Sequence, residues 1–310
     1  MYVLEIKNLF KKVSDEFSLK DINLTIENGD FVSLIGKNGA GKTTLLRILS
    51  GLIKYDKGKV FIDGIPVEKS NKVNKVIGIV QQYKGMPDTL TVQEYIKFQA
   101  RLKNADSKLL NDLIEISGLS KFSNQYLSTL SGGNLRKMHI MFSIMHKPKL
   151  VIMDEPTVGL DPVVRKEMWD YIYGLREIGI SAIISTHYLD EAEQLGNKIA
   201  IIDNGNLLTS GTKEQVKELY TSEDGLDILT VDDENALEIL KYIIELNLNF
   251  ITKSEVMGNR VRVYTDSLDF SYLPTLVNLL SEHNFKIKTI KFLEPSIEEL
   301  LMKISSFKTA

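Results

Sequence analysis

The feature that most limits the possible folds is a glycine-rich run between an apolar segment and an amphipathic one. Residues Gly36 to Thr43 read GKNGAGKT, which fits the pattern G-x-x-x-x-G-K-[ST]. The preceding run, Phe31 to Ile35, predicts a buried strand, and Thr43 to Ser50 predicts a helix that ends at Gly51. Glycines let the backbone wrap closely around an anion, with its N–H groups and the helix N-terminus facing phosphate oxygens. The sequence therefore predicts a phosphate-binding loop in an α/β fold.

The loop also supplies side chains suited to the phosphates of a nucleotide. Lys42 would place a point charge at the β- and γ-phosphates, and the Thr43 hydroxyl would help to hold Mg²⁺. We therefore expect a nucleotide site in this segment. Its candidate binding residues are Gly36, Asn38, Gly39, Ala40, Gly41, Lys42, Thr43 and Thr44.

Composition excludes several other classes of protein. The 310 residues carry a formal net charge of -3 and no long basic cluster, so we expect no nucleic-acid partner. The absence of cysteine excludes disulfides and thiolate metal sites, and is compatible with the cytosol. The apolar runs are short and strand-like, well below the roughly 18 residues of a membrane-spanning helix. We expect a chain that does not cross a membrane by itself and has no secretory signal.

Residues 1–220 alternate strand-like and helical patterns, which is typical of an α/β domain with a largely parallel sheet. Between these strands, Val92 to Leu102 and Lys108 to Ile116 have apolar residues at spacings of three and four, and predict a helical subdomain over about residues 88–145. The expected strands are Phe31 to Ile35, Val76 to Val80, Leu150 to Met153, Ser181 to Ser185 and Ile199 to Asp203.

The remaining residues predict a second, smaller domain. Residues 221–225 are short, polar and glycine-terminated, and we interpret them as a linker. Residues 226–310 predict the order βαββαβ followed by a last helix, which suggests a ferredoxin-like α+β module. The expected elements are strands Leu226 to Val231, Phe250 to Val256, Arg260 to Tyr264 and Phe285 to Phe292, and helices Glu234 to Leu246, Tyr272 to His283 and Pro295 to Ile304.

Two carboxylates follow one of the expected buried strands. Asp154 and Glu155 come directly after Leu150 to Met153, and ligands of α/β sheets bind at the carboxyl ends of the strands. Asp154 would be a partner of Mg²⁺, and Glu155 the base or polariser of the attacking water. Paired acids at a strand end are also common as solvated turn residues. The phosphate loop makes the functional interpretation the stronger one.

A second glycine-containing segment opens another helix. Ser131 is a good helix cap, and Gly132 and Gly133 expose backbone N–H groups at the positive end of the helix dipole, before the helical run Leu135 to Met145. This would be a second anion site in a chain with one phosphate loop. An ordinary loop before a helix remains the alternative on these residues alone.

Six motifs in order and spacing resemble those of the ATP-binding subunits of ABC transporters, over residues 1 to about 215. The resemblance implies a P-loop NTPase of the ABC ATPase type, with ATP and Mg²⁺ as cofactors. Gly36 to Thr43 matches the Walker A motif, Leu130 to Asn134 resembles the LSGGQ signature, Leu150 to Glu155 matches Walker B, Pro156 to Asp161 is similar to the D-loop, Gln82 resembles the Q-loop glutamine and His187 the switch histidine.

The family position of each motif implies the roles of its residues. The resemblance gives catalytic roles to Glu155, His187, Gln82 and Lys42. It implies that Mg²⁺ is bound by Thr43, Gln82 and Asp154. It also implies further nucleotide contacts from Ser131, Gly132, Gly133 and Asp161.

The chain departs from the family pattern at two positions. Asn134 stands in place of the usual signature glutamine, which keeps the amide and shortens the side chain by one methylene. Val13 falls at the position of the aromatic ring that stacks on adenine, which weakens the expected stacking. Phe17 is the alternative candidate for that contact.

The resemblance also implies partners. Two ATP-binding subunits, identical or not, would pack head to tail, with the signature of one covering the phosphates held by the other. A transmembrane permease would dock near Gln82 and the helical subdomain, at the cytoplasmic face of the membrane. Residues 186–193 and 294–300 resemble those of ABC-2-type exporters of drugs, antibiotics, lipids or sodium. The alternatives are a soluble non-transport ABC ATPase and an importer subunit.

Overall fold

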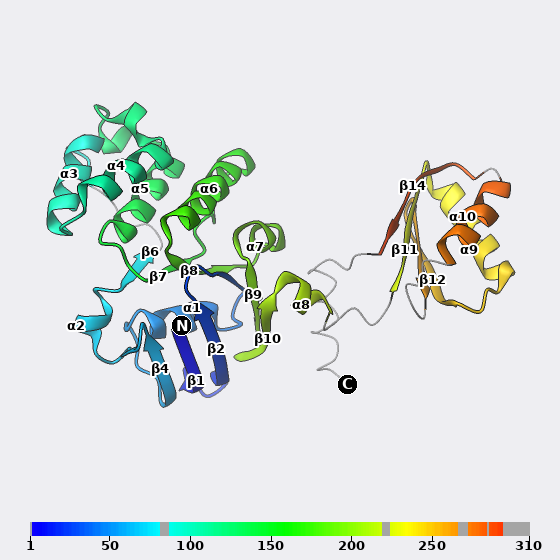
Figure 1. The fold of residues 1–310 in the computed structure, drawn as a ribbon, viewed down its shortest axis with the longest axis horizontal. Helices are drawn as coiled ribbons and strands as arrows, with labels where there is room; N and C mark the ends of the chain where they lie inside the picture. The colour runs from blue at the N-terminus through cyan, green and yellow to red at the C-terminus, as the bar shows by residue number, and fades with distance from the viewer. Residues whose placement is uncertain (1, 81–86, 219–223, 266–271, 284, 294–310) are drawn as a thin grey trace. The chain divides into compact units, whose positions relative to one another are not determined.

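The computed structural model describes two compact units of the chain (Figure 1). They comprise residues 1–216 and 217–310, and each has its own sheet. No helix within the described parts of the chain is long and apolar enough to cross a bilayer. The described residues are 2–80, 87–218, 224–265, 272–283 and 285–293.

The first unit contains a sheet of ten described strands in the order β5-β4-β1-β2-β10-β9-β3-β8-β7-β6. The five neighbours from β9 to β6 are parallel, whereas β1 pairs with β2 and β4 in antiparallel fashion. The strands are β1 (Tyr2–Lys12), β2 (Ser18–Glu27), β3 (Phe31–Ile35), β4 (Lys57–Ile62), β5 (Ile65–Pro66), β6 (Ile77–Val80), β7 (Leu150–Asp154), β8 (Ser181–Thr186), β9 (Lys198–Asp203) and β10 (Asn206–Thr212).

The five expected strands of this unit are confirmed, each within one residue at either end. They are the parallel strands, and β3 and β8 are buried at every position. A strand covered on both faces is mostly apolar, which is why a run rich in apolar residues predicted it. These strands position the site, because their carboxyl ends meet at one edge.

Helices cover the sheet on two sides through separate apolar cores. One core joins α1 to β1, β2, β4 and one set of side chains of the parallel strands, and the other joins α3 to α6 to a second set from those strands. The expected helices Val92 to Leu102 and Lys108 to Ile116 are confirmed as α3 and α4, and Figure 1 shows them beside α5. The helices are α1 (Lys42–Leu49), α2 (Ser70–Val73), α3 (Val92–Leu102), α4 (Ser107–Ser117), α5 (Gly132–Ile144), α6 (Pro162–Gly174), α7 (Leu189–Leu195) and α8 (Lys213–Glu218).

The second unit has the expected order of elements in its described residues. Its four strands lie in the order β12-β13-β11-β14 with all neighbours antiparallel, and two helices pack on the sheet through one apolar core. The expected helix Pro295 to Ile304 lies outside the described residues. The elements are β11 (Asp224–Thr230), α9 (Asp233–Leu246), β12 (Ile251–Met257), β13 (Arg260–Thr265), α10 (Tyr272–Glu282) and β14 (Ile287–Phe292).

Candidate functional site

The glycine-rich loop joins β3 to α1 and passes very close to its neighbours. Gly41 caps α1 in a left-handed conformation, φ 110°, which favours glycine. A Cβ atom at Gly36 would lie 2.3 Å from the carbonyl oxygen of Ile202, so no larger residue fits there. Gly41 supplies no side-chain cap, and the first N–H groups of α1 are therefore available to an anion.

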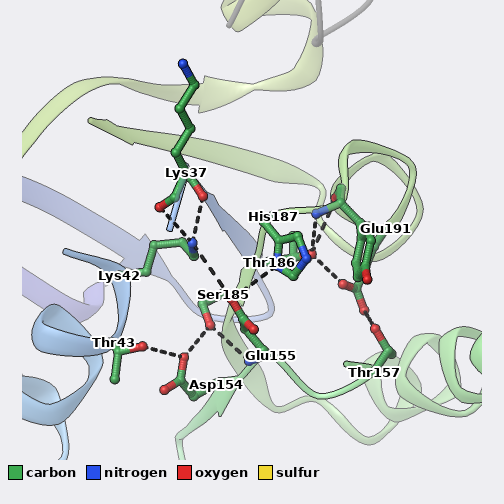
Figure 2. A network of polar contacts seen from close by, with 12 residues as sticks. Lys37, Lys42, Thr43, Asp154, Glu155, Thr157, Ser185, Thr186, His187 and Glu191 are labelled. Carbon is green, nitrogen blue, oxygen red and sulfur yellow. Dashed lines mark hydrogen bonds and ion pairs between the residues drawn. The ribbon is translucent and has the colours of Figure 1, made fainter. Parts of the chain in front are cut away.

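Lys42 folds back into this loop (Figure 2). Its Nζ donates hydrogen bonds to the carbonyl oxygens of Gly36 at 2.6 Å and Lys37 at 3.2 Å, and lies 3.8 Å from Glu155 Oε1. The side chain is only 5% exposed. Burial lowers the pKa of Lys42 below its ordinary value, and the charges of Glu155 and Asp154 oppose that effect. The loop thus holds a nearly enclosed cation facing two carboxylates.

Strand register brings these carboxylates to the loop. Asp154 at the end of β7 pairs with Ser185 of β8, and Ile35 at the end of β3 pairs with Thr186. Parallel strands in register end at one edge of the sheet, so the residues that follow them are neighbours. The expected proximity of Lys42 to Asp154 and Glu155 follows from this register.

A hydroxyl pair holds Asp154. Ser185 Oγ donates to Asp154 Oδ1 at 2.6 Å, and Thr43 Oγ1 donates to the same oxygen at 3.3 Å (Figure 2). Sequence reasoning did not identify Ser185. Its signal in the sequence is its place two residues before His187 at the end of an expected strand.

Glu155 connects the loop to His187. Its backbone has φ 47°, in the left-handed region, and its N–H donates to Ser185 Oγ at 3.0 Å. The Oε1 atom lies 3.2 Å from His187 Nδ1, and the ring of His187 lies 4.1 Å from that of Tyr188. The Glu155 carboxylate therefore lies between Lys42 and His187, with its Oε1 atom close to both.

Two oxygen ligands at this edge suit a divalent cation. Thr43 Oγ1 and Asp154 Oδ1 are adjacent, and oxygen ligands suit Mg²⁺, which keeps several waters and binds substrate phosphates as well. No group of three or more His, Cys, Asp or Glu side chains suited to a metal occurs in the described parts of the chain. The residues present therefore fit a cation whose remaining ligands are phosphate oxygens and water. They do not fit a metal site in which every ligand comes from the protein.

The signature segment lies at the start of α5. Ser131 is the cap of that helix and accepts a hydrogen bond from the N–H of Asn134 at 3.3 Å. Gly133 is buried, and a Cβ there would lie 2.5 Å from Val164 Cγ1. Between described residues, no hydrogen bond or ion pair joins Ser131, Gly132 or Gly133 to Lys42 and its neighbours. Asp161 caps α6 instead, and accepts from two N–H groups at 3.1 Å.

The two candidates for an adenine contact lie in the β1–β2 connection. Val13 is 51% exposed, and its N–H donates to the Phe17 carbonyl oxygen at 3.0 Å. Phe17 is half-buried and borders the phosphate loop, since a Cβ at Gly41 would lie 3.0 Å from Phe17 Cζ. Gln82 lies outside the described residues.

Comparisons with known proteins agree on a family. A model of the family described as ABC transporter matches residues 19–158. The linearmycin resistance ATP-binding protein LnrL of Bacillus subtilis is 30% identical over 98% of this chain and 98% of its own length. The probable sulfate/thiosulfate import ATP-binding protein CysA of Chlorella vulgaris is 31% identical over 70% of this chain and 94% of its own. The Nod factor export ATP-binding protein I of Cupriavidus pinatubonensis is 31% identical over 74% and 71%.

Solved structures show the same fold for the first unit. The dimeric structure of a post-hydrolysis state of the ATP-binding cassette MJ0796, bound to ADP and Pi, has a TM-score of 0.57 and 27% sequence identity. The match covers 67% of this chain and 98% of that one.

Proposed function

The chain belongs to the ABC transporter family, and from that premise we propose that it is the ATP-hydrolysing subunit of an exporter. One observation carries the proposal. Lys42, Asp154 and Glu155 meet at the carboxyl edge of a parallel sheet, beside the start of α1, whose first N–H groups are available to phosphates. Cation, metal ligand and carboxylate base are the parts that phosphoryl transfer to water requires.

The geometry supports a division of labour within the site. Lys42 would leave its loop carbonyls for the β- and γ-phosphates, while Thr43 and Asp154 would hold Mg²⁺, which neutralises charge on those phosphates when bound. Glu155 would orient the attacking water, and His187 beside it would contact the γ-phosphate. Gln82 receives its metal and catalytic role from its family position alone.

A second subunit would complete the site. The start of α5 offers backbone donors and the Ser131 hydroxyl at the positive end of a helix of 13 residues, yet lies apart from Lys42 within the chain. We propose that Ser131, Gly132, Gly133 and Asp161 of one subunit close over the ATP of the other. The MJ0796 cassette is dimeric with ADP and Pi bound, which supports the pairing of two subunits. ATP would hold the dimer together, and hydrolysis would release it.

A cavity of about 610 Å³ is the proposed docking place of the permease. It lies where α1 ends, β6 begins and both α3 and α5 end, so it joins the parallel sheet to the helical subdomain. Among its lining residues are Leu52, Lys75, Ile77, Lys103 and His146. A segment held there would move with both layers when the dimer opens. A permease docked there would hold the subunit at the cytoplasmic face of the membrane.

The second unit favours export over import. The LnrL match extends over nearly the whole chain, whereas the match to the import protein CysA covers 70% of it. We propose an ATP-binding domain of residues 1–220 with a helical subdomain over about 88–145, and an accessory domain of 226–310. Of the expected linker 221–225, the last two residues belong to strand β11 instead, so the accessory sheet begins at Asp224. The strand order β12-β13-β11-β14 supports a ferredoxin-like fold for the accessory domain.

Purification from native membranes tests the function. The tagged chain should copurify with a polytopic permease in a fixed ratio, and ATP hydrolysis by the complex should rise when the transported compound is added. A soluble partner in place of a permease would favour the non-transport ABC ATPase. Uptake of a compound into cells, lost on deletion of the chain, would favour an importer.

A further inference from the structure

A buried carboxylate lies behind the site and has no role in the chemistry proposed above. Glu191 lies in the first turn of α7, is 1% exposed, and does not contact Lys42 or Glu155 through any of its described hydrogen bonds. A carboxylate this deeply buried costs free energy unless donors surround it. The hydrogen-bond donors around Glu191 therefore indicate its role.

Three donors from three different segments converge on it, and Figure 2 shows two of them, Thr157 and Thr186. Thr157 Oγ1 donates to Oε1 at 2.6 Å, Trp169 Nε1 donates to the same oxygen at 3.3 Å, and Thr186 Oγ1 donates to Oε2 at 2.5 Å. Burial raises the pKa of Glu191 above its ordinary value, while these three bonds and the charge of Arg165 favour the ionised form. Two of the three donors belong to loops that carry proposed catalytic groups.

Thr157 ties Glu191 to the Glu155 loop. It lies two residues after Glu155 and is fully buried, and the Val158 N–H donates back to the Glu155 carbonyl oxygen at 3.3 Å. Glu155 itself has a left-handed backbone, which is strained for a residue with a side chain and persists only where its surroundings enforce it. The bond from Thr157 to Glu191 is one such constraint on that loop.

Thr186 ties Glu191 to the turn that carries His187. The Thr186 hydroxyl donates to Glu191 and accepts a hydrogen bond from the Tyr188 N–H at 3.0 Å, which closes a turn around His187. Because Glu191 takes the hydroxyl proton, the oxygen of Thr186 faces the Tyr188 N–H with its lone pairs. The other acceptor within reach, the Tyr188 carbonyl oxygen, lies farther away at 3.4 Å, so Glu191 is the main acceptor that orients this hydroxyl and the turn.

We propose that Glu191 is a positioning residue, whose buried carboxylate fixes the loop of Glu155 relative to the turn of His187. The consequence for catalysis rests on the proposed function. A carboxylate is required because one side chain must accept from donors on both of its oxygens. A glutamine of equal size presents an NH₂ group in place of one of them. Trp169 Nε1 can only donate, so the amide oxygen of Glu191→Gln stays with Trp169 and the NH₂ group faces Thr186. The Thr186 hydroxyl then loses its carboxylate acceptor while the packing is kept.

The test compares Glu191→Gln with Ser33→Ala in the full-length chain. Ser33 is buried on β3, and its hydroxyl donates to the Ala192 carbonyl oxygen at 3.1 Å. Its loss removes a buried hydrogen bond to the same helix, α7, and leaves both loops untouched. Thr157→Val and Thr186→Val each remove one donor, and replace Glu191→Gln if that variant does not fold.

Hydrogen exchange without nucleotide tests the positioning directly. In Glu191→Gln, the amides of residues 185–188 should exchange at least about fivefold faster, with a smaller increase at residues 155–158 and little change in Ser33→Ala. Each threonine variant should loosen its own loop. Unchanged exchange in both segments overturns the proposal. The exchange experiment tests the positioning role even if the wild-type chain does not hydrolyse ATP. Absence of hydrolysis by the wild type would contradict the proposed function, and not the positioning role.

Kinetics test the consequence for the reaction. Glu191→Gln should lower kcat about tenfold and leave KM for ATP within about twofold, because the phosphate loop is not attached to Glu191. Ser33→Ala should leave kcat and KM near those of the wild type, even if it lowers Tm as much as Glu191→Gln does or more. Loss of stability alone would then not explain a lower kcat. An unchanged kcat in Glu191→Gln, or a matching loss of kcat in Ser33→Ala, would overturn the catalytic consequence.

Discussion

Two helices of this chain begin with glycine-rich segments, and their first turns are arranged differently. At α1 the cap is Gly41, which offers no side-chain acceptor, so the first N–H groups remain available. At α5 the cap is Ser131, whose hydroxyl already accepts from the Asn134 N–H. The first arrangement needs a ligand to satisfy its donors, whereas the second is partly satisfied without one.

The charges around the two helix starts differ as well. Lys42, Asp154 and Glu155 gather at α1, whereas an ion pair between Lys137 and Glu167 lines a cavity of about 360 Å³ next to the start of α5. Of the two, the α1 start thus combines free N–H donors with a cation, the proposed metal ligand and the proposed base. At the α5 start, the neighbouring carboxylate of Glu167 is paired with Lys137. Under the proposed function, the first half-site carries the chemistry and the second closes over it.

The largest effect should come from removing the base of the first half-site. Glu155→Gln should lower kcat about a thousandfold while ATP still binds, because the neutral amide cannot accept the water proton. ATP should then hold a stable dimer, measurable by light scattering after size-exclusion chromatography. Glu115→Gln, on the exposed face of α4, serves as the matched control and should behave as the wild type. Normal turnover in Glu155→Gln would remove the assigned role.

The next effect tests the cation. Lys42→Ala should weaken ATP binding roughly a hundredfold, corresponding to about 3 kcal/mol, because it removes a buried charge that faces the phosphates. Titration calorimetry with ATP measures this. Lys59→Ala, at an exposed position of β4, is the control for loss of a positive charge. Unchanged affinity in Lys42→Ala would contradict the phosphate-binding role of Lys42.

The sequence predicted the first half-site better than the connections behind it. Apolar runs predicted the buried parallel strands, and motifs at their ends placed Lys42 near Asp154. Strand β5, with two residues, and β10, which is mostly half-buried, lack such a signal. The bond from Ser185 to Asp154 depends on the register of β7 and β8, and the bonds of Glu191 depend on the path of α7. Neither follows from spacing along one chain.

A smaller effect distinguishes the second half-site from the first. A Cβ atom at Gly132 would have no heavy atom within 4 Å, so a side chain fits there without a clash. Gly132→Asp should leave folding and monomer binding intact, because a carboxylate in the first turn suits the helix dipole. It should lower kcat roughly thirtyfold, corresponding to about 2 kcal/mol, through repulsion of the phosphates. Gly132→Asn is the matched neutral control and should lose much less.

Mixing variants tests whether the two half-sites come from different subunits. Lys42→Ala and Gly132→Asp are each impaired as homodimers, but a mixed dimer has one site with both halves intact. An equal mixture should recover roughly a quarter of the wild-type rate if subunits pair at random. No recovery would indicate that each chain completes its own site. It would contradict the proposal that α1 and α5 of different subunits form one site.

The smallest effect concerns the base of the nucleotide, beside the α1 half-site. Phe17 borders Gly41, whereas Val13 is exposed, so Phe17→Ala should weaken ATP binding roughly fivefold, corresponding to about 1 kcal/mol of ring stacking. Val13→Ala should change it little. Tripolyphosphate has no base, and its affinity should be equal in Phe17→Ala and the wild type. An equal loss for both ligands would mean that Phe17 supports the loop and does not stack on adenine.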